Sequence, residues 1–155
     1  MTITNHVLAG AIIGLTITNP FVAVVLAFAS HFFMDALPHF GYAGQKGYGE
    51  ALKHKMSFVV ATLTLLTTLI VVGLIVANAE WFALLTGLIA ASPDAVGIYN
   101  WLAYEKQDRQ AHGILRVFHV KFHRAIQWCE RPWGVIVEVA VFVILFSTLI
   151  KLIYV

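Results

Sequence analysis

Residues 56–77, MSFVVATLTLLTTLIVVGLIVA, carry no charged side chain and decide the fold class of this chain. A helix rises about 1.5 Å per residue, so this stretch is long enough to cross the roughly 30 Å hydrocarbon core of a bilayer. The rest of the chain agrees, since 60% of its 155 residues are hydrophobic and its mean hydropathy is +0.83. A soluble domain is about 45–50% apolar. The sequence therefore predicts an integral membrane protein.

Four further apolar segments flank this stretch and predict an all-α fold, a polytopic bundle of about five hydrophobic helices. The other expected helices are residues 2–18, 20–37, 81–104 and 133–155. Pro20 suits the first position of its helix, because its missing N–H needs no partner there. Pro93 should kink or break the helix that contains it. Length and composition together predict one transmembrane domain covering residues 1–155.

Residues 113–131 differ from these segments and predict an amphipathic, basic helix that lies in the membrane interface. Leu115 and Phe122 belong to its apolar stripe, while polar and basic side chains mark the opposite face. His119 and His123 could be a second ligand pair or could contact phosphate headgroups, and plain interfacial contact is the simplest alternative. The residues expected to hold an anionic headgroup are Arg116, His119, Lys121, His123 and Arg124.

The basic residues predict the orientation of the helices. With five spans, the N-terminus and segments 41–55 and 105–131 share one side of the membrane with nine of the ten Lys and Arg residues. Basic loops stay on the cytoplasmic side, so we expect a cytoplasmic N-terminus and an external C-terminus in the cytoplasmic membrane of a prokaryote. The net charge of +2 gives no case for nucleic-acid binding. The single cysteine, Cys129, excludes an internal disulfide and a cysteine-based zinc site.

Several ionisable residues are expected at one depth inside the helices. Counting about 1.5 Å per residue from the external turns places His6, His31, Asp35, Asp94 and Glu138 at depths of roughly 16–23 Å. Ionisable groups in membrane helices are costly, so a layer of them indicates a functional site. His31 and Asp35 are four residues apart on one helical face. Imidazole and carboxylate suit zinc, manganese or iron, and His39 could join them from the end of the same helix.

Each of these residues also has a simpler explanation. His31 and Asp35 could be a buried hydrogen-bonded pair that ties two helices together. Asp94 follows Pro93 and could cap a restarted helix, and His6 could simply mark a helix start. Glu138 could reach the interface or pair with Arg131 instead of acting as a base.

The chain resembles the small inner-membrane proteins classed as membrane-bound metal-dependent hydrolases, which are distantly similar to zinc-dependent phospholipase C. The resemblance rests on short signatures: Thr4-Asn5-His6, Ser30-His31-Phe32-Phe33-Met34-Asp35, Ser92-Pro93-Asp94 and Phe122-His123-Arg124. The family pattern places Pro-Asp before the Ser-His-x-x-x-Asp motif, and the order is exchanged in this chain. The resemblance implies a divalent metal, a role for His6, His31, Asp35, Asp94 and His123, and hydrolysis of a phosphoester or related bond.

These observations lead to one expected function and two alternatives. We expect hydrolysis of an ester or phosphoester of a lipid or amphiphile at the cytoplasmic leaflet, with water activated by a divalent metal, zinc before manganese or iron. The expected ligands are His6, His31, Asp35, His39 and Asp94, and Glu138 or Asp94 would act as the catalytic base. The alternatives are a cation or proton transporter, or another metal-handling protein, and a non-catalytic membrane scaffold. The sequence does not indicate an oligomeric state.

Overall fold

The computed structural model describes residues 1–41, 54–103, 121, 125–126 and 129–155. Five helices make up nearly all of this part of the chain, which confirms the all-α fold. They are α1 (Ile3–Thr16), α2 (Pro20–Asp35), α4 (Lys55–Ala77), α5 (Trp81–Ala103) and α7 (Gly134–Tyr154). Their bounds agree with the expected helices to within a few residues.

Three of the helices, α4, α5 and α7, are long and apolar enough to cross a membrane. The other two, α1 and α2, are also apolar but contain only 14 and 16 residues. Large apolar side chains cover the outside of the bundle, and Phe21, Leu69 and Ile144 are examples. A soluble protein rarely exposes so much contiguous apolar surface, so the exterior suits a hydrocarbon environment.

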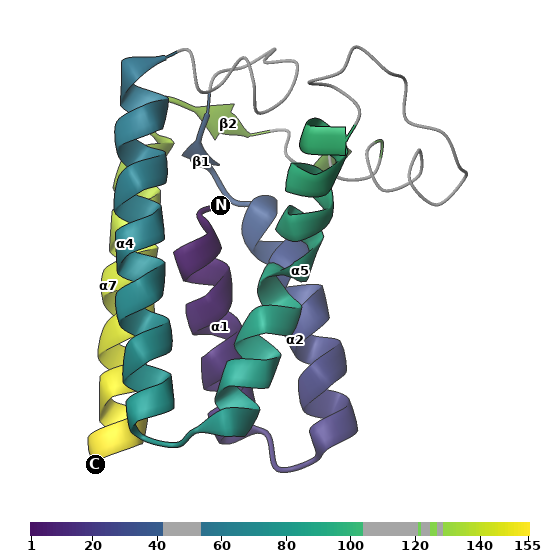
Figure 1. Ribbon diagram of the computed structural model, residues 1–155, viewed down its shortest axis with the longest axis vertical. Helices are drawn as coiled ribbons and strands as arrows, with labels where there is room; N and C mark the ends of the chain where they lie inside the picture. The colour runs from purple at the N-terminus through teal and green to yellow at the C-terminus, as the bar shows by residue number, and fades with distance from the viewer. Residues whose placement is uncertain (42–53, 104–120, 122–124, 127–128) are drawn as a thin grey trace.

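The short helix α1 lies in the centre of the bundle and packs against α2, α4, α5 and α7 (Figure 1). Its apolar side chains Val7, Leu8 and Ala11 form a buried core with residues of α4, α5 and α7, including Ile75 and Leu149. Because the first half of α1 is surrounded by other helices, its polar residues Thr4, Asn5 and His6 are buried in protein. This position makes α1 suitable for carrying a polar site.

Small residues bring α1 unusually close to α5. A Cβ atom added at Gly10 would lie 2.7 Å from Ala90 Cβ and 2.8 Å from Gly87 Cα, and one added at Gly87 would lie 3.0 Å from the Val7 carbonyl oxygen. Close approach of this kind is a common basis of helix association in membranes. This contact was not predicted, although Gly10 and Gly14 have the small-xxx-small spacing.

A hydroxyl cluster joins α1 to α4. Thr4 Oγ1 lies 2.9 Å from Thr67 Oγ1 and 2.8 Å from Thr68 Oγ1, and it donates to the Thr64 carbonyl at 3.0 Å. Such bonds between membrane helices are typically worth about 0.6 and up to 1.7 kcal/mol.

Thr4→Val should therefore lower the free energy of unfolding by about 1 kcal/mol, because the shape is kept and the interhelical bonds are lost. Denaturant titration in mixed micelles would measure the loss. The matched control is Thr62→Val, since the exposed Thr62 hydroxyl donates to the Phe58 carbonyl of its own helix at 2.9 Å. Equal losses in the two variants would show that the Thr4 cluster does not tie the helices together.

The helix ends follow from local sequence. At the start of α2, Asn19 Oδ1 accepts hydrogen bonds from the N–H groups of Phe21 and Val22 at 3.0 and 3.2 Å. Pro20 occupies the first turn, as predicted. These caps fix the tight connection between α1 and α2.

Pro93 was expected to kink or break its helix, and a break does not occur, because α5 continues through this residue. Pro93 has no N–H to donate to the Ile89 carbonyl one turn earlier. The Ser92 hydroxyl donates to that same carbonyl at 2.8 Å. Serine side chains can replace the bond that proline removes from a membrane helix. Asp94 is therefore an interior helical residue and does not cap a restarted helix.

A short parallel sheet is the feature that departs most from the expected fold. Strands β1 (His39–Phe40) and β2 (Glu130–Arg131) pair His39 with Glu130 and Phe40 with Arg131. Residues 130–131 were expected to end the amphipathic helix 113–131, and here they are extended. The remainder of that expected helix lies largely outside the described residues.

Candidate metal centre

Three helices contribute four buried ligand groups to one place in the bundle. His6 comes from α1, His31 and Asp35 from α2, and Asp94 from α5. Each offers one ligand atom within 4.8 Å of the others, so the group could hold a metal ion. The two histidines and Asp35 are at most 1% exposed, and Asp94 is 6% exposed. Four of the five residues expected to share one layer are therefore brought together in space.

Three of the separations between possible ligand atoms are close to those expected around a bound metal ion. His6 Nε2 lies 3.1 Å from Asp35 Oδ1 and 3.8 Å from Asp94 Oδ2, and His31 Nε2 lies 3.3 Å from Asp35 Oδ2. Ligands bound tetrahedrally to zinc at about 2.0–2.2 Å are separated by roughly 3.4 Å. The observed separations lie on both sides of that value.

The hydrogen bond of His31 fixes which of its nitrogens could bind a cation. His31 Nδ1 lies 2.9 Å from the Ala90 carbonyl oxygen. A carbonyl can only accept, so Nδ1 carries the proton, and in neutral His31 the lone pair is on Nε2. Metal-binding histidines usually donate their second N–H to a carbonyl or carboxylate in this way. The lone pair then faces Asp35 Oδ2, another acceptor, and a proton or a cation is needed between them.

His6 is held by its neighbours in a different way. Its ring stacks on that of His31 with centroids 4.1 Å apart and planes inclined by 26°. Its Nδ1 atom is buried and has no hydrogen-bond partner among the described residues. The orientation of His6 therefore depends on the stacking and on the contact with Asp35.

The charges of the centre favour a divalent cation. Two ionised carboxylates and two neutral imidazoles carry a total charge of −2. Burying such charges unpaired costs several kcal/mol each. The Met1 amino group lies 2.6 Å from Asp35 Oδ1 and offsets part of this charge. Imidazole and carboxylate ligands together suit zinc, iron or manganese.

The predicted ligand His39 and the predicted base Glu138 lie outside this group of four. His39 follows the end of α2, in β1, where its Nδ1 donates to the Leu37 carbonyl at 2.8 Å and its Nε2 lies 3.8 Å from Glu130 Oε1. Helix α2 ends at Asp35, so His39 does not continue the face that carries His31. Glu138 is buried on α7, and its carboxylate accepts hydrogen bonds from backbone N–H groups of Thr2 and Phe40.

The predicted headgroup-binding residues are mostly not described. Lys121 is exposed and helical. Arg116, His119, His123 and Arg124 lie outside the described residues, so their expected roles stay predictions.

Three contributors to the centre were missed by the sequence analysis. The Ala90 carbonyl holds His31, and Ser92 compensates for Pro93. Asn5 donates to the Glu138 backbone carbonyl at 3.1 Å and so connects α1 to α7. The serine next to a membrane-helix proline was a usable signal. The contact of His31 with the Ala90 carbonyl had no signal in the sequence, because any residue type can supply a backbone carbonyl.

Comparison of the chain with protein-family models, curated proteins and solved structures finds no significant match.

Proposed function

We propose that the protein is a membrane-embedded, metal-dependent hydrolase that cleaves an ester or phosphoester of a lipid-like substrate. The observation that carries the proposal is the group of four buried ligands, His6, His31, Asp35 and Asp94, contributed by three helices of an apolar bundle. Ionisable groups within a membrane helix bundle generally mark a functional site. The resemblance to membrane-bound metal-dependent hydrolases points in the same direction.

We also propose how the helices are oriented in the membrane. All five helices would cross the membrane, with the N-terminus and the β1–β2 sheet at the cytoplasmic side and the C-terminus outside. The two termini lie towards opposite ends of the bundle (Figure 1). The short helices α1 and α2 would cross a locally thinned bilayer or be covered by their neighbours. The distribution of basic residues supports this orientation.

We assign metal binding to the four ligands and proton transfer to Glu138. His6, His31, Asp35 and Asp94 would hold a zinc, manganese or iron ion. A divalent ion supplies Lewis acidity, which polarises the scissile group and makes water a stronger acid. Glu138 would accept the proton of the attacking water. The backbone N–H groups of Thr2 and Phe40 hold the Glu138 carboxylate in place.

Glu138 is linked to the centre through the N-terminus. The Met1 ammonium contacts Asp35, and its charge also acts on the Glu138 carboxylate. Glu138 therefore lies on the side of the centre that faces α7 and the N-terminal end of α1.

Hydrolysis is best tested with purified protein loaded with zinc or manganese and supplied with phosphatidylglycerol, phosphatidylethanolamine or polyprenyl phosphate in mixed micelles. We expect mass spectrometry to detect a released headgroup, phosphate or fatty acid. Glu138→Gln should lower the rate by about 10²–10⁴-fold while the metal content stays unchanged, because it removes a base and keeps the ligands. Glu80→Gln, at the opposite end of the bundle, is the matched control.

Two outcomes would contradict the proposal. One is bound metal with no turnover of any lipid class. The other is metal-dependent cation uptake by proteoliposomes without hydrolysis, which would assign the same residues to transport.

A further inference from the structure

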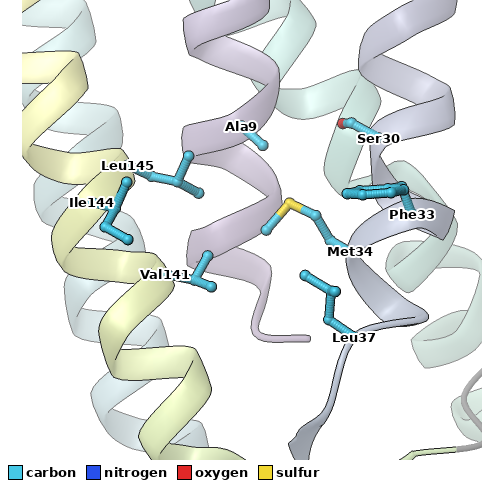
Figure 2. A pocket seen from close by; sticks show the side chains of 8 residues that line it. All are labelled: Ala9, Ser30, Phe33, Met34, Leu37, Val141, Ile144 and Leu145. Carbon is cyan, nitrogen blue, oxygen red and sulfur yellow. The ribbon is translucent and has the colours of Figure 1, made fainter.

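An apolar groove opens on the side of the bundle between α2 and α7. Its volume is about 350 Å³, within the range of roughly 300–1,000 Å³ that ligand sites occupy. Helix α1 forms its floor at Ala9, and α2 and α7 form its walls (Figure 2). The lining residues are Ala9, Ser30, Phe33, Met34, Leu37, Val141, Ile144 and Leu145.

The apolar lining of the groove favours a hydrocarbon occupant over water. The one hydroxyl among the lining residues belongs to Ser30, and it donates to the Ala27 carbonyl of its own helix at 2.7 Å. A water molecule in the groove would need two to four polar partners. An empty groove would forfeit dispersion contacts along its walls. Phe33 and Ile144 at the rim are 72% and 64% exposed, so the groove opens towards the surrounding hydrocarbon.

The groove and the metal centre both include residues of α1 and α2, at neighbouring positions along these two helices. On α2, the lining residues Ser30 and Met34 immediately precede the ligands His31 and Asp35. On α1, Ala9 lies one turn beyond His6. The Met34 side chain points between α1 and α7, into the groove (Figure 2). Met34 is 6% exposed and lines the groove, where a flexible side chain could adapt to a ligand.

From these observations we infer that the groove holds a hydrocarbon chain of the lipid substrate. The inference rests on the proposed function, and it names the substrate class as an amphiphile with at least one long apolar chain. Residues 30–35 extend about 8 Å along α2, and Leu37 follows the end of this helix. The chain would run inward from the Leu37 end, and the polar group would remain near Asp35.

Photo-crosslinking locates the chain directly. The probe is phosphatidylglycerol with a diazirine in its acyl chain, diluted into phosphatidylglycerol vesicles that contain the unmodified, zinc-loaded protein. We expect more label in residues 30–37 and 141–145 than on the exposed face of α4, at Leu65 and Leu69. An even distribution between the groove and α4 would mean ordinary lipid contact and would overturn the inference.

Substitutions that fill the groove provide a second test of the inference. Ala9→Phe should lower groove labelling by about tenfold, because its ring occupies the floor. Val141→Trp fills the groove from α7 and should do the same. Ala61→Phe, on the exposed face of α4, should change nothing. Unchanged labelling in both folded groove variants would overturn the inference.

Zinc content measured on the same samples separates the inference from the proposed function. Bound zinc without selective labelling would overturn the groove assignment alone. Selective labelling without zinc, after supplementation, would overturn the hydrolase and with it the assignment of the chain to a substrate.

Discussion

Replacing His31 by alanine should reduce bound zinc from about one ion per chain to a small fraction at micromolar free metal. A four-ligand zinc site is worth about 10–16 kcal/mol, so one ligand represents a hundredfold or more in affinity. His31 is central because it contacts Asp35, stacks on His6 and is oriented by Ala90. Elemental analysis after dialysis against a defined zinc buffer would measure the loss.

The matched control is His54→Ala. His54 is exposed and precedes α4, away from the four ligands, so its loss should leave the zinc content unchanged. If the His31 variant is folded and still binds one zinc per chain, His31 is not a ligand. If both variants lose zinc equally, the ion is bound at the surface.

Gly10→Ala should destabilise the protein by about 1–3 kcal/mol, the usual cost of overpacking. The added methyl group would lie 2.7 Å from Ala90 Cβ, so α1 and α5 must move apart. Ala90 also supplies the carbonyl that holds His31. The zinc affinity of this variant should therefore fall together with its stability, as measured by denaturant titration and zinc competition.

Gly73→Ala provides the comparison for this variant. A Cβ atom added at Gly73 meets nothing within 4 Å. Alanine is intrinsically better than glycine in a helix by about 0.5–1 kcal/mol, so this change should be neutral or slightly stabilising. Similar losses of stability in the two variants would show that close packing of α1 on α5 does not hold the centre together.

Most helices of this fold were predictable, because each follows from a strong local signal. The uncharged run in residues 56–77 and Pro20 at the start of α2 each determine an element without help from the rest of the chain. The layer of ionisable residues was also predictable, since helical rise converts sequence position into depth. Depth alone brought His6, His31, Asp35 and Asp94 together correctly.

The remaining features depend on contacts that sequence position does not reveal. The depth of a residue does not show in which direction its side chain leaves the helix. Depth therefore could not separate Glu138 on α7 from the four ligands. The continuation of α5 through Pro93 depends on one hydroxyl bond from Ser92. The β1–β2 pairing joins residues about ninety positions apart, and no local pattern in two-residue strands predicts it.

X-ray absorption spectroscopy of the zinc-loaded, unmodified protein tests the central claim most directly. We predict a coordination shell of nitrogen and oxygen only, at about 2.0–2.2 Å, with the outer scattering of two imidazole rings. That result would match two histidines and two carboxylates. A sulfur contribution at about 2.3 Å, which would implicate Cys129, or a shell without imidazole would contradict the account.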